Sequence, residues 1–171
     1  MDAKNTSTSA QEFIINREFN APRERVWRAW TEREQLMRWF GPKGTTVSHA
    51  MLDFRPGGTF HYAMRSADGK EMWGKWVFRE IVPPALLEFI QSFSDAAGGL
   101  GRNPMAADWP LETLSTVAFS EADGKTTVTL NSQPINAGEK ERQLFAGAFG
   151  SMTQGWGGTF DKLGGYLAAM A

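Results

Sequence analysis

Residues 138–167 read GEKERQLFAGAFGSMTQGWGGTFDKLGGYL, and this stretch decides the fold. Its large apolar residues recur every three or four positions, at Phe145, Phe149, Met152, Trp156, Phe160, Leu163 and Leu167. That spacing is the period of one face of an α-helix. At about 1.5 Å per residue, a stretch of this length would form a rod roughly 45 Å long. Because the rest of the chain reads mostly as strands, we expect a curved sheet that wraps around this one helix.

Glycine is unusually frequent in the same stretch. After Gly138, which begins the stretch, the positions are Gly147, Gly150, Gly155, Gly157, Gly158, Gly164 and Gly165. Each glycine costs roughly 1 kcal/mol relative to alanine in a helix interior. Two explanations are open, a close approach of the helix to the sheet or a break near Gly157 and Gly158.

The composition is that of one soluble domain. The chain has 171 residues, of which 42% are hydrophobic and 22% charged, and its formal net charge is −1. We expect a disordered tail over residues 1–11 and a single domain over 12–169. A chain without basic excess is a poor partner for nucleic acid. The apolar runs are too short for a membrane span, and no apolar signal segment begins the chain, so a cytoplasmic location is the default prediction.

The chemistry-bearing residues are few. The chain has no cysteine, which excludes disulfides, thiolate catalysis and cysteine-based zinc sites. Its two histidines show no metal-ligand spacing, so we predict no metal and no cofactor. By contrast there are seven Trp, twelve Phe and eight Met, which supply large, adaptable apolar surface. Such a set suits either a dense core or a lined cavity.

A strand over residues 12–19 and two short helices precede the main strands. Asn20 is predicted to cap the first helix, which spans 23–30, and Thr31 with Glu34 has the pattern of a capping box for the second. Turn residues then separate six predicted strands, at 45–54, 59–66, 71–82, 86–93, 113–120 and 125–133.

Residues 94–110 are predicted to be irregular, because they are rich in glycine and contain Asn103-Pro104 and Trp109-Pro110. A loop of this length inside a compact domain is more often functional or mobile than structural. We expect it to cover the mouth of a cavity, with Met105 and Trp109.

Alternation along the strands predicts which side chains face the helix. Phe60, Tyr62 and Met64 share one face of 59–66, so His61 should face solvent. His49 shares a face with Val47, Met51 and Asp53 in the preceding strand. If that face points inward, His49 is a candidate general base. Its separation from Asp53 is roughly 13 Å by strand rise, too far for a direct pair, and the favoured role of Asp53 is to cap a turn.

Five short motifs, in order, resemble one family. They are WFGPKG at 39–44, DFRPGG at 53–58, Met64 with Asp68-Gly69, EIVPP at 80–84, and Gly155-Trp156 followed by DKL at 161–163. The chain resembles the activator-of-Hsp90-ATPase-like group (AHSA1 type) of the START-related, SRPBCC helix-grip superfamily. The resemblance implies an α+β fold of order β-α-α-β6-α, with a cavity between the curved antiparallel sheet and the C-terminal helix.

The resemblance implies function less closely, because one fold hosts many activities. Superfamily relatives bind lipids, hormones or polyketides, a few are cyclases or hydrolases, and homodimers occur. The co-chaperone that names the family carries a separate N-terminal domain that takes part in Hsp90 binding. In this sequence only the short predicted tail over residues 1–11 precedes the domain, which counts against direct activation of Hsp90.

The predicted ligand-binding set combines the resemblance with the alternation of apolar residues. An ordinary packed core is the competing explanation for the apolar members of this set. Gln91 alternates with Phe89 and Phe93, and as a lone polar group it could orient a ligand. The set is Trp39, Phe40, Tyr62, Met64, Trp76, Phe78, Phe89, Gln91, Phe149, Met152 and Trp156.

The leading functional hypothesis is non-enzymatic binding of a small hydrophobic or amphipathic molecule, and no catalytic residue is assigned. Two alternatives stay open. The first is a chaperone-associated or stress-response module that acts through its surface. The second is a cyclase- or hydrolase-like enzyme that uses His49, Asp53 or Tyr62. A homodimer is compatible with the resemblance, although no residue argues for it.

Overall fold

The computed structural model describes residues 12–104 and 106–170. The predicted tail at 1–11 and the predicted cover residue Met105 lie outside the described residues. The elements are β1 (Phe13–Phe19), α2 (Arg23–Thr31), α3 (Arg33–Trp39), β2 (Thr45–Leu52), β3 (Thr59–Ser66), β4 (Glu71–Val82), β5 (Leu86–Ser94), β6 (Leu100–Gly101), β7 (Glu112–Ala122), β8 (Lys125–Ile135), α4 (Glu139–Gly147) and α5 (Phe149–Met170).

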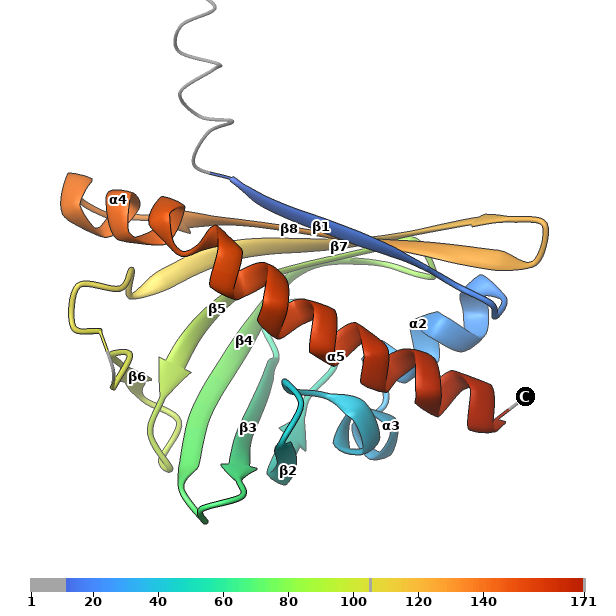
Figure 1. Ribbon diagram of the computed structural model, residues 1–171, viewed down its shortest axis with the longest axis horizontal. Coiled ribbons are helices and arrows are strands. Elements are labelled where there is room, and N and C mark those ends of the chain that lie inside the picture. Colours follow the sequence, from blue (N-terminus) through green and yellow to red (C-terminus); the bar gives the residue numbers. More distant parts are fainter. Residues whose placement is uncertain (1–11, 105, 171) are drawn as a thin grey trace, which may run out of the picture.

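The strands form one antiparallel sheet in the order β1-β8-β7-β5-β4-β3-β2, with the short β6 paired to β5. The sheet curls, and α5 runs across its concave side, while α2 and α3 close one end (Figure 1). This confirms the predicted α+β fold with a curved sheet around the C-terminal helix. The one strand not predicted, β6, lies in the segment 94–110.

The inner face of the sheet follows the predicted alternation in β3. Phe60 is fully buried and Tyr62 is 2% exposed, and both rings contact Phe40. Trp76 and Phe89 come from neighbouring strands and stack with ring centroids 4.1 Å apart. These large rings fill the space between the sheet and the helices at the end that α2 and α3 cover, where Trp76 contacts Trp30 and Phe40.

The predicted facing of β2 is wrong at His49. The register of β2 against β3 shifts between Val47 and His49, so the strand contains a bulge. A bulge inserts one residue and reverses the facing of those that follow. Val47 and Ala50 are therefore buried, whereas His49 and Met51 are exposed.

Both predicted helix caps are also wrong. Pro22, in an extended conformation, precedes α2, and no side chain caps that helix. Thr31 is the last residue of α2 rather than the cap of α3, and its hydroxyl donates to the carbonyl oxygen of Trp27 at 2.9 Å. A buried threonine satisfies its hydroxyl within the helix in this way. Glu32, in an extended conformation, then precedes α3.

The C-terminal helical stretch breaks once, at Ala148 between α4 and α5. It does not break at Gly157 and Gly158, where α5 is continuous. A Cβ atom added at Gly158 would lie 3.2 Å from the side chain of Lys43. At this position the close approach of another segment to the helix therefore explains the glycine.

Two consecutive residues of α5 hold the turn that precedes β2. The Lys162 ammonium donates to the carbonyl oxygens of Gly41 (3.1 Å), Pro42 (3.4 Å) and Thr45 (3.0 Å). Asp161 pairs with Lys43 (2.9 Å) in this turn and with Arg17 (2.8 Å) in β1. We call these contacts of Asp161 and Lys162 the α5 clamp.

Both ionisable groups of the α5 clamp have lowered pKa values, for different physical reasons. Hydrogen bonds from Lys43 and Arg17 lower the pKa of Asp161, which stays ionised at neutral pH. Burial lowers the pKa of Lys162.

No helix in the described part of the chain is long and apolar enough to cross a membrane.

Candidate functional site: a cavity between the sheet and α5

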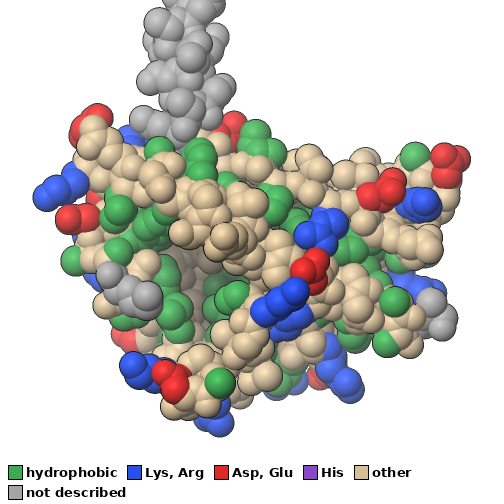
Figure 2. Space-filling model, viewed as in Figure 1, with side chains coloured by type: hydrophobic (Ala, Val, Ile, Leu, Met, Phe, Trp, Pro, Cys, Tyr) green, Lys and Arg blue, Asp and Glu red, His purple; other side chains and the backbone are tan. Residues whose placement is uncertain are grey.

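A cavity of about 280 Å³ lies between the concave face of the sheet and α5. Figure 2 shows it as a hollow on this face of the molecule, with hydrophobic side chains along its walls. Ligand pockets in proteins are usually apolar hollows of a few hundred Å³ that carry a small number of placed polar groups. The cavity is at the small end of that range and suits a molecule of one or two rings.

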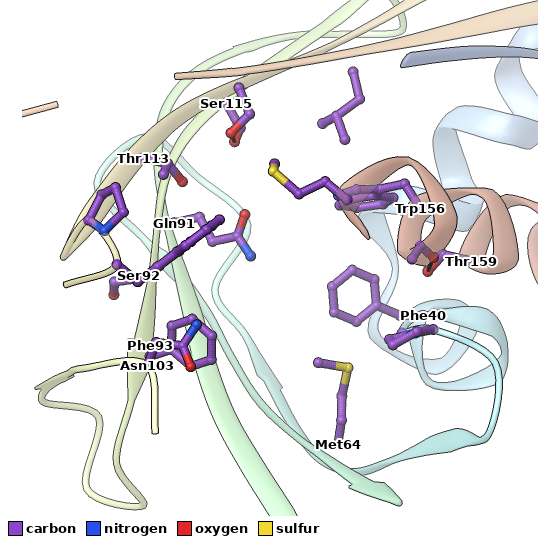
Figure 3. Close-up of a pocket in the computed structure, with 18 of the residues that line it drawn as sticks. Phe40, Met64, Gln91, Ser92, Phe93, Asn103, Thr113, Ser115, Trp156 and Thr159 are labelled. Atoms are coloured by element: carbon purple, nitrogen blue, oxygen red, sulfur yellow. Dashed lines mark hydrogen bonds between the residues drawn. The ribbon is translucent and has the colours of Figure 1, made fainter. Parts of the chain in front are cut away.

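The helix side of the cavity is apolar apart from Thr159 of α5, whose hydroxyl donates to the carbonyl oxygen of Gly155 at 2.9 Å. Met152 and Trp156 of α5 line this side. Phe40 and Met64 lie beside Trp156 on the adjoining wall (Figure 3). Trp156 stacks on Trp30 behind it, with ring centroids 6.2 Å apart. The indole is therefore supported on one side while it also lines the cavity.

The sheet side of the cavity carries a cluster of polar side chains, beside the apolar Phe93 and Leu130. Gln91 of β5 pairs in register with Thr113 of β7, and Ser115 of β7 pairs with Ser132 of β8. The two serine hydroxyls lie 3.0 Å apart and share one hydrogen bond. In Figure 3 Gln91, Thr113 and Ser115 lie on the sheet side, opposite Trp156. We call Gln91, Thr113, Ser115 and Ser132 the polar wall.

The polar wall explains why a cavity exists. Along β7, small Thr113 and Ser115 are followed on the same face by Val117 and Phe119, and along β8 Ser132 follows Leu130. The small residues leave space between sheet and helix at one end, whereas the large residues fill it at the other.

Tyr62 forms part of the cavity floor, where Gln91 also lines the cavity, and its ring lies edge-on to Trp76. Burial raises the pKa of Tyr62 to about 12. The phenol is therefore protonated at neutral pH and can donate a hydrogen bond. Opposite it on β4 stands Gly74, where an added Cβ atom would lie 2.5 Å from the Tyr62 hydroxyl oxygen.

None of the described residues that line the cavity carries a charged side chain. Lys162 contacts the backbone of Gly41 and Pro42, which line the cavity, and its ammonium has three donors and contacts three carbonyl oxygens. Arg102 and Glu141, which adjoin the mouth, pair with each other at 3.2 Å. The cavity interior therefore offers hydrogen bonds without a counter-charge.

The mouth is bordered by the segment 94–110 and by α4. Trp109 lines the cavity and contacts Phe145 of α4, with ring centroids 5.4 Å apart. Asn103 and Pro110 of the same segment also line it. The ion pair between Arg102 and Glu141 joins the segment to α4 at the surface.

The structure brings six of the eleven predicted ligand-binding residues to the cavity: Phe40, Tyr62, Met64, Gln91, Met152 and Trp156. The other five do not line it. Phe78, like Trp76 and Phe89, is buried in the core at the filled end. Trp39 is fully buried, and its indole donates to the carbonyl oxygen of Ala29 at 3.0 Å. Phe149 packs between Phe13 and Phe145.

Sequence reasoning missed the polar wall except for Gln91. The sequence feature that could have revealed these residues is a break in the apolar alternation of two neighbouring strands. Thr113 and Ser115 continue the face of Val117, and Ser132 continues the face of Leu130. Small polar residues at inward positions of adjacent strands predict unfilled space. Other lining residues that were not predicted include Ser92, Phe93, Leu130, Phe145 and Thr159.

The histidines and Asp53 do not line the cavity. His49 and His61 flank Trp73, with ring centroids 5.1 and 4.9 Å from it, and His61 Nε2 lies 2.9 Å from the carbonyl oxygen of Asp95. His61 is partly covered rather than fully exposed. Asp53 pairs with Arg55 at 2.9 Å on the surface. In the described residues no three His, Cys, Asp or Glu side chains gather as a metal site would require.

This cavity and the curled sheet define a helix-grip domain of the SRPBCC superfamily. The chain belongs to the Activator of Hsp90 ATPase homolog 1-like protein family, which it matches over residues 20–168. No curated protein matches the sequence.

Solved structures share the fold. A solution structure of a protein from Arthrobacter aurescens is 30% identical, with a TM-score of 0.76, and the match covers 95% of this chain and 88% of that one. A crystal structure from Nitrosomonas europaea is 23% identical, with a TM-score of 0.74 and coverage of 95% and 97%. An AHSA1 protein from Silicibacter pomeroyi is 20% identical, with a TM-score of 0.70 and coverage of 94% and 99%.

Proposed function

We propose that this protein binds a small hydrophobic or amphipathic molecule in the cavity between the sheet and α5, without transforming it. One observation carries the proposal: a cavity of about 280 Å³ with an apolar helix wall and a polar sheet wall. The apolar part of the lining is surface that a bound molecule with apolar rings would remove from water, which is favourable.

The location of the titratable groups supports binding over catalysis. His49 and Asp53, two of the three residues considered for an enzyme, lie at the surface. The third, Tyr62, lies at the cavity but has a pKa raised to about 12, which makes it a poor general base at neutral pH.

The test uses a matched pair of glycines in α5. Gly155 lines the cavity, and an added Cβ atom there meets no heavy atom within 4 Å. Gly165 is equally free of neighbours but is exposed and does not line the cavity. Leucine at either position improves helix propensity. Only at position 155 does the side chain extend into the cavity.

The expected result is selective loss of binding. Equilibrium dialysis with 2-naphthol, a neutral two-ring probe, should show at least a roughly tenfold weaker affinity for Gly155→Leu than for the wild type, an effect of about 1.4 kcal/mol. Gly165→Leu should bind within about twofold of the wild type. Equal binding by both variants, or a wild type that retains no probe, would overturn the proposal.

Association with a chaperone is the second candidate, because the family is named for activators of the Hsp90 ATPase. In that case the protein acts through its surface. A pull-down that recovers no Hsp90-type partner, together with an unchanged ATPase rate of such a chaperone, would remove this candidate. A cytoplasmic location remains the default prediction.

A further inference from the structure

We infer that the cavity selects neutral molecules that carry a hydroxyl, carbonyl or amide group, and that it rejects carboxylates of the same shape. The inference rests on the proposed function and adds the chemical class of the ligand. Three observations carry it: the uncharged lining, the composition of the polar wall, and the position of the aromatic side chains.

The first observation concerns charge. No described residue that lines the cavity is charged, and Lys162, the cation behind Gly41 and Pro42, is occupied by three carbonyl oxygens. An ionised carboxylate transferred from water into such a site has no counter-charge, and the desolvation penalty is large. A fatty acid or another organic anion therefore fits this cavity poorly.

The second observation concerns hydrogen bonds. The Gln91 amide lines the cavity and has two N–H donors and a carbonyl acceptor. The hydrogen bond between Ser115 and Ser132 uses one of two hydroxyl hydrogens, so the other can serve a third group. The Thr113 hydroxyl lies beside Gln91 on the next strand. The polar wall can both donate to and accept from a neutral polar group.

The third observation concerns shape. Trp156 and Phe40 face the polar wall across the cavity (Figure 3). Aromatic side chains favour flat apolar partners in offset-stacked or edge-to-face contact. A small ring system with one polar edge would therefore place its rings against Trp156 and Phe40 and its polar edge against Gln91 and Thr113.

The experiment compares three probes of one shape at pH 7: naphthalene, neutral 2-naphthol and charged 2-naphthoate. By equilibrium dialysis 2-naphthol should bind about two- to tenfold more tightly than naphthalene, the value of one hydrogen bond. It should bind at least about tenfold more tightly than 2-naphthoate. Equal or tighter binding of 2-naphthoate would overturn the inference while leaving the proposed function intact. No binding of any probe would remove both.

A matched pair of variants on β7 assigns the effect to the polar wall. Thr113→Val keeps the shape but removes the hydroxyl, and it should lower the affinity for 2-naphthol about two- to tenfold without weakening naphthalene. Thr116→Val makes the same change on the other face of the strand, outside the cavity, and should change neither. An unchanged ratio of 2-naphthol to naphthalene affinity in Thr113→Val, Gln91→Leu and Ser115→Ala would overturn the inference.

Discussion

At the scale of single residues, small side chains decide where space remains inside this protein. Ser115 is 1% exposed and Ser132 6%, so both occupy core positions where a strand usually carries valine or leucine. Their mutual hydrogen bond removes most of the penalty for burying two hydroxyls. Gly74 has the complementary role, since the missing side chain accommodates the Tyr62 ring and hydroxyl.

Gly74→Ala should therefore destabilise the protein by about 1–3 kcal/mol, because the new methyl group overlaps the Tyr62 ring and must displace it. Urea unfolding measures the change. Gly165→Ala, at an exposed helix position with open space, should instead raise the stability by up to about 1 kcal/mol. Gly74→Ala with wild-type stability would show that Tyr62 is not held over this glycine.

At the scale of elements, the α5 clamp positions the wall that Phe40 and Gly41 contribute to the cavity. Lys162 donates to two carbonyl oxygens of the turn before β2 and to that of Thr45, the first residue of β2. Asp161 joins the same turn and β1 to the helix. Hydrogen bonds from a charged donor to carbonyl oxygens are stronger than neutral ones. The DKL motif therefore has a structural explanation that does not involve the ligand.

Lys162→Met keeps much of the side-chain length but removes the charged donor from three carbonyl oxygens, of which that of Pro42 still accepts from the N–H and hydroxyl of Thr45. It should lower the free energy of unfolding by roughly 1–3 kcal/mol. Thermal and urea unfolding measure it. Lys140→Met is the control, because the Lys140 side chain is 81% exposed and the substitution removes only an ion pair with Asp108 at 3.7 Å. If both variants unfold alike, the clamp does not stabilise the turn.

The elements also show what the sequence can predict. Strict alternation placed Phe60 and Tyr62 on the inner face correctly, because β3 is regular. It failed at His49, because the bulge in β2 reverses which side chains face inward after Val47. No residue type in this part of the strand marks a bulge. The helical period of α5 was evident, but the break at Ala148 was not, since alanine is the best helix former.

At the scale of the whole molecule, the cavity arises from the curvature of the sheet together with the gradient of side-chain size along its strands. Large rings such as Trp76 and Phe89 fill one end, and the polar wall leaves the other end open. Aromatic content alone cannot separate these two ends, which is why Trp76, Phe78 and Phe89 were predicted as ligand contacts but are core. The distinction depends on which strands are neighbours, and only the sheet order β8-β7-β5-β4 provides it.

The central claim, that the cavity is a ligand site, is tested most directly by the seven tryptophan indole N–H signals in a two-dimensional NMR titration with 2-naphthol. Trp156 and Trp109 line the cavity, whereas Trp27 of α2 does not line it and packs against Phe54 and Phe119. We predict saturable shifts at Trp156 and Trp109 and none at Trp27, with signals assigned by single Trp→Phe variants. Shifts centred on Trp27, or no shifts at saturating probe, would contradict the account.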